Sequence, residues 1–135
     1  MPNSKLISPL FSFSFLLITQ HSFSQAPTIE WQNTIGGSNY DWLYSLQQTT
    51  DGGYILGGYS FSSISGDKTE AGLGSYDYWV VKINSIGSIE WQNTIGGSGD
   101  DELHSLQQTT DGGYILGGKS SSGISGDKTE ASLGS

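Results

Sequence analysis

The chain contains nearly the same sequence twice. The stretch IEWQNTIGGSNYDWLYSLQQTTDGGYILGGYS begins at Ile29, and a near copy, IEWQNTIGGSGDDELHSLQQTTDGGYILGGKS, begins at Ile89, which gives a period of 60 residues. A fixed period of this length is typical of repeat architectures, in which each repeat is one supersecondary unit. Such a unit buries its apolar faces only against neighbouring units, so we expect stability to come from stacking.

Each period contains four segments with the composition of short β-strands. β-Branched and aromatic residues concentrate in residues 43–50, 54–60, 78–84 and 89–95, which Asp-Gly and Gly-Gly pairs separate. No segment has a helical apolar period of useful length, so we predict an all-β fold. Four antiparallel strands per repeat are typical of a β-propeller blade, although an open stack of four-stranded sheets would give the same period.

The two copies differ at 8 of the 47 positions that they share. Six of these differences form cross-strand pairs if the hairpin has the following register. A two-residue turn at Asp51-Gly52 would place position 40 opposite 63, 42 opposite 61 and 44 opposite 59. A three-residue turn with a glycine bulge would shift this pairing by one. The first register predicts an aromatic face in the first copy, made by Tyr40, Trp42, Tyr44, Tyr59 and Phe61. The second copy has Asp100, Glu102, His104, Lys119 and Ser121 there.

This aromatic face has two interpretations. Flat amphipathic rings are good anchors for a glycan or a protein partner, so the five residues are our candidate partner-binding surface. The simpler interpretation is that the face packs against a neighbouring blade. Trp31 and Trp91, which begin equivalent strands, are predicted to lie in the core.

Other candidate sites are weaker. Asp100, Asp101 and Glu102 form an acidic cluster, but calcium needs six to eight oxygen ligands from several chain positions. At the three equivalent positions the first copy has only one acidic residue, Asp41. We therefore predict a solvated acidic turn and neither a metal nor a cofactor. His104 stands where the first copy has Tyr44. The spacing of serine and acidic residues around it does not indicate a Ser-His-acid catalytic arrangement. We predict no catalytic residue and no enzyme activity.

One loop is identical in both copies. The sequence ISGDKTE occupies residues 64–70 and 124–130. Asp and Thr side chains often hydrogen-bond to nearby backbone in such loops. We expect Asp67 or Thr69 to have this structural role, and the longer loop 61–77 to project from the sheet.

The beginning of the chain has the pattern of a secretory signal peptide. Lys5 precedes an apolar and hydroxylic run over residues 6–19, and small residues follow at Ser22 and Ser24. We predict a signal peptide over residues 1–24, with cleavage after Ala26 as the close alternative. The apolar run is shorter than the roughly 20 residues of a spanning helix. Residues 25–135 are then the mature repeat region, with repeat 1 at 29–88 and partial repeat 2 at 89–135.

Composition excludes one class of partner. The formal charge of the whole chain is −8, there are no cysteines, and removal of Lys5 with the signal peptide would make the charge −9. Such a balance repels phosphate backbones, so nucleic-acid binding is excluded. The absence of cysteine excludes a disulfide framework.

The sequence GGSGDDELHSLQQTTDGGYILGG resembles bacterial β-propeller repeats of the GGSGDD…DGG…GG type. The 60-residue unit is similar to arrays in secreted or surface-displayed proteins of the Bacteroidetes group. The resemblance implies a propeller of several blades, often followed by a sorting domain for type IX secretion. On the residues given, we expect this chain to depart from that pattern, with fewer repeats and without such a domain. Closed propellers need about four to eight blades. The sequence contains about one and three-quarter repeats, so we expect it to be a truncated array.

The resulting expectation is an exported protein, periplasmic, extracellular or on the cell surface, with a structural or interaction role. Its expected partners are a protein or glycan, further blades or other copies of itself. Two alternatives stay open. In the first, the chain is part of a propeller hydrolase or lyase whose catalytic residues lie outside this chain. In the second, it is the non-functional remnant of a broken array.

Overall fold

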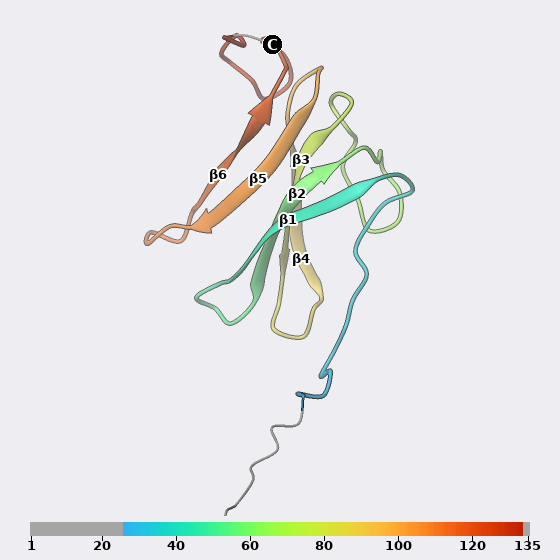
Figure 1. The fold of residues 1–135 in the computed structure, drawn as a ribbon, viewed down its shortest axis with the longest axis vertical. Helices are drawn as coiled ribbons and strands as arrows, with labels where there is room; N and C mark the ends of the chain where they lie inside the picture. The colour runs from blue at the N-terminus through green and yellow to red at the C-terminus, as the bar shows by residue number, and fades with distance from the viewer. Residues whose placement is uncertain (1–25, 134–135) are drawn as a thin grey trace, which may run out of the picture.

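The computed structural model describes residues 26–133, which form six β-strands and no helix (Figure 1). The predicted all-β class is therefore confirmed for this part of the chain. Within the same residues, no helix has the length and apolar character needed to cross a membrane. The predicted signal peptide, residues 1–24, lies outside the described residues.

Four strands form the first sheet, in the order β1-β2-β3-β4, and all neighbouring strands are antiparallel. They are β1 (Asp41–Gln48), β2 (Tyr54–Ser60), β3 (Asp77–Ile83) and β4 (Ile89–Ile95). Their positions agree with the four predicted segments to within two residues at each end. Strand propensity and the Asp-Gly turns were therefore sufficient to find the strands.

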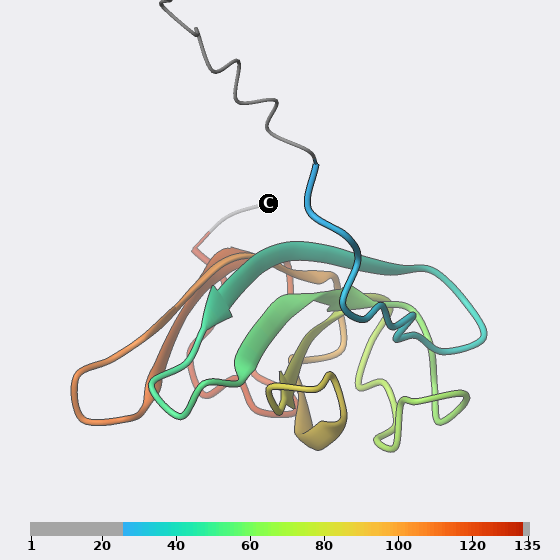
Figure 2. The same cartoon turned by 90° about the horizontal axis from the view of Figure 1, so that it is seen from below.

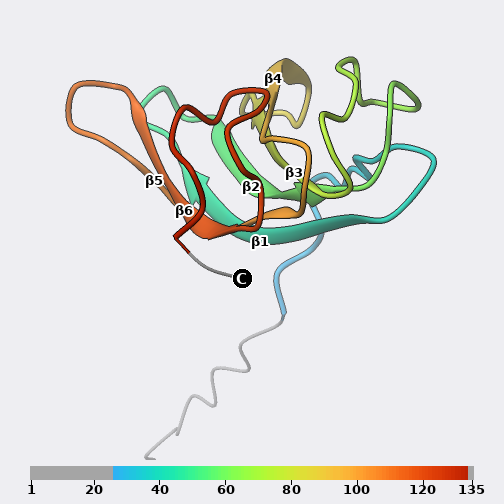
Figure 3. The same ribbon diagram turned by 90° about the horizontal axis from the view of Figure 1, so that it is seen from above.

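The second sheet is the hairpin β5 (Asp101–Gln108) and β6 (Tyr114–Ser120). Its turn, residues 109–113, and the equivalent turn of the first sheet, residues 49–53, point to the same end of the molecule (Figures 1 and 3). The hairpin lies against β1 and β2 of the first sheet (Figure 2).

The register predicted from a two-residue turn is wrong. Next to the turn the pairing is shifted by one residue, as the three-residue alternative predicts, from Gln48 opposite Tyr54 to Ser45 opposite Gly57. Trp42, not Tyr44, lies opposite Tyr59, and Leu46 lies opposite Leu56. The pairing shifts between Leu43 and Ser45, where a β-bulge leaves the backbone of Tyr44 without a residue opposite it on β2. The second hairpin has the same shift at the equivalent place.

The turn explains part of this difference, because residues 49–53 form a longer connection than a two-residue turn. The Asp51 carboxylate accepts hydrogen bonds from Thr49 Oγ1 at 2.5 Å and from the Gly53 amide at 3.0 Å. The Thr49 amide donates to the Gly53 carbonyl at 2.9 Å. Gly52 has φ +83°, which favours glycine. The side chain of Asp51 therefore stabilises a turn over residues 49–53, and this turn shifts the pairing of β1 with β2 by one residue.

Apolar packing joins the two sheets. Leu103 and Leu106 of β5 are buried together with Ile55 of β2 and Val80 of β3. The opposite face of the first sheet has a second cluster, made by Trp79, Val81 and Ile83 and partly covered by Ile35 and Leu56.

The N-terminal segment differs from its sequence copy. Residues 89–95 form β4 on the edge of β3, whereas the same sequence at 29–35 is not a strand. The prediction that Trp31 and Trp91 belong to the core is also wrong, since both indoles are exposed. Trp31 packs on Tyr54 and Trp91 on Tyr114, with ring centres 6.0 and 5.7 Å apart. Each indole thus has a tyrosine on one side and solvent on the other.

Candidate functional site

The five predicted aromatic residues lie together with a sixth, Tyr76. We call these six residues the aromatic surface: Tyr40, Trp42, Tyr44, Tyr59, Phe61 and Tyr76. They come from β1, from β2 and from the loop residues next to β1, β2 and β3. Sequence comparison between the copies therefore grouped the right residues, although the register used for it was wrong.

A continuous row of rings runs along β1 and β2. The ring centres of Tyr40 and Trp42 lie 5.4 Å apart at an interplanar angle of 25°. Trp42 and Tyr59 are 5.0 Å apart, and Tyr59 and Tyr44 stack at 5.3 Å and 21°. Tyr44 joins this row because it lies two residues after Trp42, and residues two apart in a strand share a face.

Tyr76 joins the remaining ring, Phe61, to this row. Its ring centre lies 5.3 Å from Phe61, 5.5 Å from Tyr59 and 5.6 Å from Trp42. Sequence reasoning missed Tyr76 because it belongs to the segment YDYWVVKIN, which occurs once and so has no second copy for comparison. The one available signal was its place directly before a predicted strand.

The second sheet covers only one end of the aromatic surface. The imidazole of His104 meets Tyr44 edge-on, with centres 5.1 Å apart, and lies 6.3 Å from Tyr59. Tyr40 remains 68 % exposed, and Tyr44, Trp42 and Phe61 are exposed as well. Among the ring contacts made by the second sheet, those of His104 reach Tyr44 and Tyr59, so within the described residues a neighbouring unit covers part of this face and leaves the rest exposed.

Polar groups border the same end. Glu102 pairs with Lys119 at 3.3 Å and lies 3.7 Å from His104. The hydroxyl groups of Tyr44 and Tyr59 are 3.2 Å apart and share a hydrogen bond. This bond, followed by burial, raises the pKa of Tyr59 to about 12. The surface thus offers flat apolar rings beside a carboxylate, an ammonium group and two neutral hydroxyls.

The acidic cluster 100–102 separates into different roles. Asp101 is buried and accepts hydrogen bonds from the Gly97 amide and the Ser122 hydroxyl, both at 2.7 Å. Glu102 faces Lys119 instead. Over the described part of the chain, no three His, Cys, Asp or Glu side chains gather in a way that would hold a metal ion.

The ISGDKTE loops are tied to backbone in both copies. The Asp67 carboxylate accepts a hydrogen bond from the Gly36 amide at 3.2 Å, and the Asp67 amide donates to the Gly36 carbonyl at 2.9 Å. Asp127 and Gly96 make the same two bonds, at 3.2 and 2.8 Å. Asp67 therefore has the structural role that the sequence suggested.

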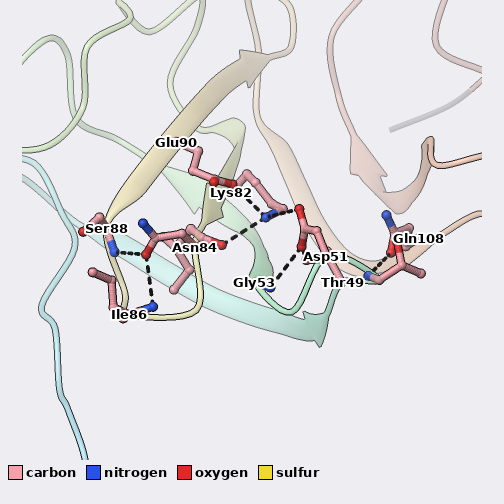
Figure 4. A network of polar contacts seen from close by, with 11 residues as sticks. Thr49, Asp51, Gly53, Lys82, Asn84, Ile86, Ser88, Glu90 and Gln108 are labelled. Carbon is pink, nitrogen blue, oxygen red and sulfur yellow. Dashed lines mark hydrogen bonds and ion pairs between the residues drawn. The ribbon is translucent and has the colours of Figure 1, made fainter.

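The buried ammonium group of Lys82 lies beside the turn of the first hairpin, residues 49–53 (Figure 4). Lys82 Nζ contacts Glu90 at 2.8 Å, Asp51 at 3.0 Å and the Ile83 carbonyl at 3.1 Å. Burial alone would lower the pKa of Lys82, but its hydrogen bonds to Glu90 and Asp51 raise it. Two carboxylates and the Ile83 carbonyl thus match the three hydrogen-bond donors of Lys82, and this group stabilises the turn.

Comparison of the chain with family models, with curated proteins and with solved structures returned no match.

Proposed function

We propose that the chain is an exported repeat protein that binds a partner outside the cytoplasm through its aromatic surface, without a catalytic step of its own. The observation that carries this proposal is the exposure of stacked rings. Large aromatic side chains normally bury most of their area, and contiguous exposed apolar patches mark interaction sites. Tyr40, Trp42, Tyr44 and Phe61 are exposed although they form one connected group.

The class of partner that we propose for this surface is a glycan. Sugar rings combine an apolar face, which stacks on indole and phenol rings, with hydroxyl groups that need hydrogen-bond partners. The hydroxyls of Tyr44 and Tyr59 and the carboxylate of Glu102 are such partners at one end of the row.

We also propose that the four-stranded sheet is one blade of a propeller-like array. The strand order β1-β2-β3-β4 and the antiparallel pairing support this proposal, as does the packing of the second hairpin on the face of the first sheet. In such an array the loop after β2, which carries Phe61 and Tyr76, would be displayed at the rim.

The test uses the residues that the chain itself has at equivalent positions. The variant Tyr40→Asp with Trp42→Glu and Tyr44→His gives the first copy the side chains of the second, which the same hairpin already accommodates. Binding to a glycan array is measured for the wild type and this variant. We expect glycan binding by the wild type and at least a tenfold loss in the variant, the order of magnitude for one lost stacking anchor.

Trp31→Ala is the matched control, because Trp31 is exposed to a similar degree as Trp42 but lies outside the aromatic surface. This control should bind as the wild type does. Equal binding by the triple variant would contradict the proposal. A wild type that binds glycoproteins before but not after protease treatment would point to a protein partner instead.

A further inference from the structure

The contact between the two sheets has an apolar and a polar part. In the apolar part, Leu103 and Leu106 of β5 pack over Ile55 and Gly57 of β2. A β-carbon added at Gly57 would lie 2.7 Å from Leu103 Cδ2, so the absence of a side chain there lets the sheets approach.

The polar part binds the backbone of β5. Ser45 Oγ accepts a hydrogen bond from the Leu106 amide at 3.2 Å and donates to the Leu106 carbonyl at 3.3 Å. Gln47 Oε1 accepts from the Gln108 amide at 2.8 Å, and Gln108 Oε1 accepts from the Thr50 amide at 3.0 Å. The contact is therefore specific in register as well as apolar.

The leucine half of this contact occurs a second time, and there the other described residues leave it largely uncovered. Leu43 and Leu46 are the sequence copies of Leu103 and Leu106. Leu103 and Leu106 are 0 % and 6 % exposed, whereas Leu43 and Leu46 are 56 % and 58 % exposed. Beside Leu43 lies a cavity of about 240 Å³.

The receiving half is also repeated. Ile115 is the copy of Ile55, and it is 62 % exposed where Ile55 is 0 % exposed. Gly117 is the copy of Gly57, and a β-carbon added there would have no atom within 4 Å. Ser105 and Gln107, the copies of the two polar side chains, are exposed as well.

We propose that copies of this chain dock head to tail, with Leu43 and Leu46 of one copy on Ile115 and Gly117 of the next. The occupant is a second copy because the chain already makes this contact internally with residues of the same identity. The two surfaces differ, so the contact is heterologous and generates a ring or an open filament. The Val80 side of the internal contact is not repeated within residues 89–135, so the contact between copies is weaker than the internal one.

This docking goes beyond the proposed partner binding and uses other residues. None of the four docking residues belongs to the aromatic surface. Loss of glycan binding and loss of self-association are therefore separable by mutation.

Cysteine pairing tests the predicted geometry directly, because the chain has no cysteine of its own. A β-carbon at Gly57 would lie 3.4 Å from Leu106 Cβ, close to the roughly 3.5–4.5 Å that a disulfide requires. The equivalent pair between copies is Gly117→Cys in one chain and Leu46→Cys in another. After mild oxidation we expect a covalent dimer in the mixture of the two variants, and predominantly monomer for either variant alone.

The intramolecular pair Gly57→Cys with Leu106→Cys is the control for geometry, and it should close within one chain. No covalent dimer in the mixture, while this control closes, would overturn the proposal. Equal dimer formation by either single variant would overturn it too, since that pattern indicates a symmetric contact.

Sedimentation velocity gives a second measurement that needs no cysteine. The sedimentation coefficient of the wild type should rise with protein concentration, and Gly117→Val should abolish this rise by filling the receiving surface. Gly123→Val is the matched control, because a β-carbon at Gly123 also meets no atom within 4 Å but lies outside the docking surface. It should keep the rise. A wild type that sediments as a monomer at every concentration would overturn the proposal.

Discussion

Gly57 of β2 lies directly beneath Leu103 of β5, so that a β-carbon added to the glycine would lie 2.7 Å from Leu103 Cδ2. The same β-carbon would lie 3.0 Å from Leu106 Cδ1. Both leucines are buried, and they have little space into which to move. The approach of the two sheets therefore depends on the absence of a side chain at position 57.

The first prediction compares this glycine with its sequence copy. Gly57→Ala should lower the free energy of unfolding by about 1–3 kcal/mol, the usual cost of overpacking a core. Gly117→Ala should change it by no more than about 0.5 kcal/mol, because the position is open to solvent. Denaturant unfolding followed by tryptophan fluorescence measures both at a low protein concentration. Equal losses in the two variants would contradict the packing described for Leu103.

The second prediction concerns the charged turn around Asp51. Hydrogen bonds from Thr49 and Gly53, and then Lys82, hold the pKa of Asp51 well below its usual value. A lowered pKa means that the stabilisation is present above the unfolded-state pKa of about 3.9 and is lost as the pH falls below it. Asp51→Asn should therefore be less stable than the wild type at neutral pH and should lose less stability on acidification.

Asp111→Asn is the matched control for this prediction. Asp111 has the same bonds from Thr109 and the Gly113 amide, but no lysine in residues 26–133 forms an ion pair with it. The destabilisation by Asp51→Asn at neutral pH should exceed that by Asp111→Asn, and thermal unfolding over a pH series measures both. If the two variants behave alike, the ion pair with Lys82 contributes nothing to stability.

The sequence was sufficient to locate the strands, but not to pair them. Strand positions follow from local composition and from turn glycines, which the sequence displays. The register next to the turn depends on local bonds of Asp51 with Thr49 and Gly53, and the three-residue alternative anticipates it. The bulge at Tyr44 shifts the pairing once more, and no local motif in the sequence marks it. The exposure of Trp31 and Trp91 could not be read either, because it depends on which neighbour covers each strand.

The grouping of the aromatic residues was predictable for a different reason. Side chains that change together between two copies of one hairpin have a common environment, and this signal does not depend on the register. Tyr76 could not be found in this way, because its segment occurs once in the chain. Comparison between copies thus reveals only those site residues that both copies contain.

The third prediction tests the tyrosine pair within the aromatic surface. The hydrogen bond from Tyr44, followed by burial, raises the pKa of Tyr59 to about 12. The neutral phenol is favoured in the folded chain, so this contribution to stability is present below the unfolded-state pKa of about 10 and is lost as the pH rises from there toward 12. Tyr44→Phe removes one hydroxyl and should lower the pKa of Tyr59, which ultraviolet titration of tyrosinate absorbance measures.

Tyr54→Phe serves as the control for this titration, because Tyr54 packs on Trp31 away from the pair. It should leave the late tyrosinate transition in place. An unchanged late transition in Tyr44→Phe would show that the bond between the two hydroxyls is not the cause.

The fourth prediction concerns Asp77, which is fully buried at the start of β3. One carboxylate oxygen accepts hydrogen bonds from the Leu73 amide at 2.8 Å and the Gly74 amide at 3.2 Å. The other oxygen, Oδ1, has no hydrogen-bond partner within the described residues. Burial raises the pKa of Asp77, and the nearby Asp101 raises it further. Folding therefore favours the neutral form of this side chain.

A raised pKa means that this contribution is present below the unfolded-state pKa of about 3.9 and is lost as the pH rises through the folded-state value. Asp77→Asn keeps one acceptor oxygen for the two amides and carries no charge. It should be more stable than the wild type at neutral pH, by about 1 kcal/mol, since a buried carboxylate with one unsatisfied oxygen is removed and the attraction of Lys68 offsets its burial only in part. Asp101→Asn should instead be destabilising. Within the described residues the Asp101 carboxylate has no buried oxygen without a partner, and its negative charge strengthens the bonds that it accepts from Gly97 and Ser122. Thermal unfolding across a pH series separates the two, and a loss of stability in both variants would show that the Asp77 charge is favourable where it lies.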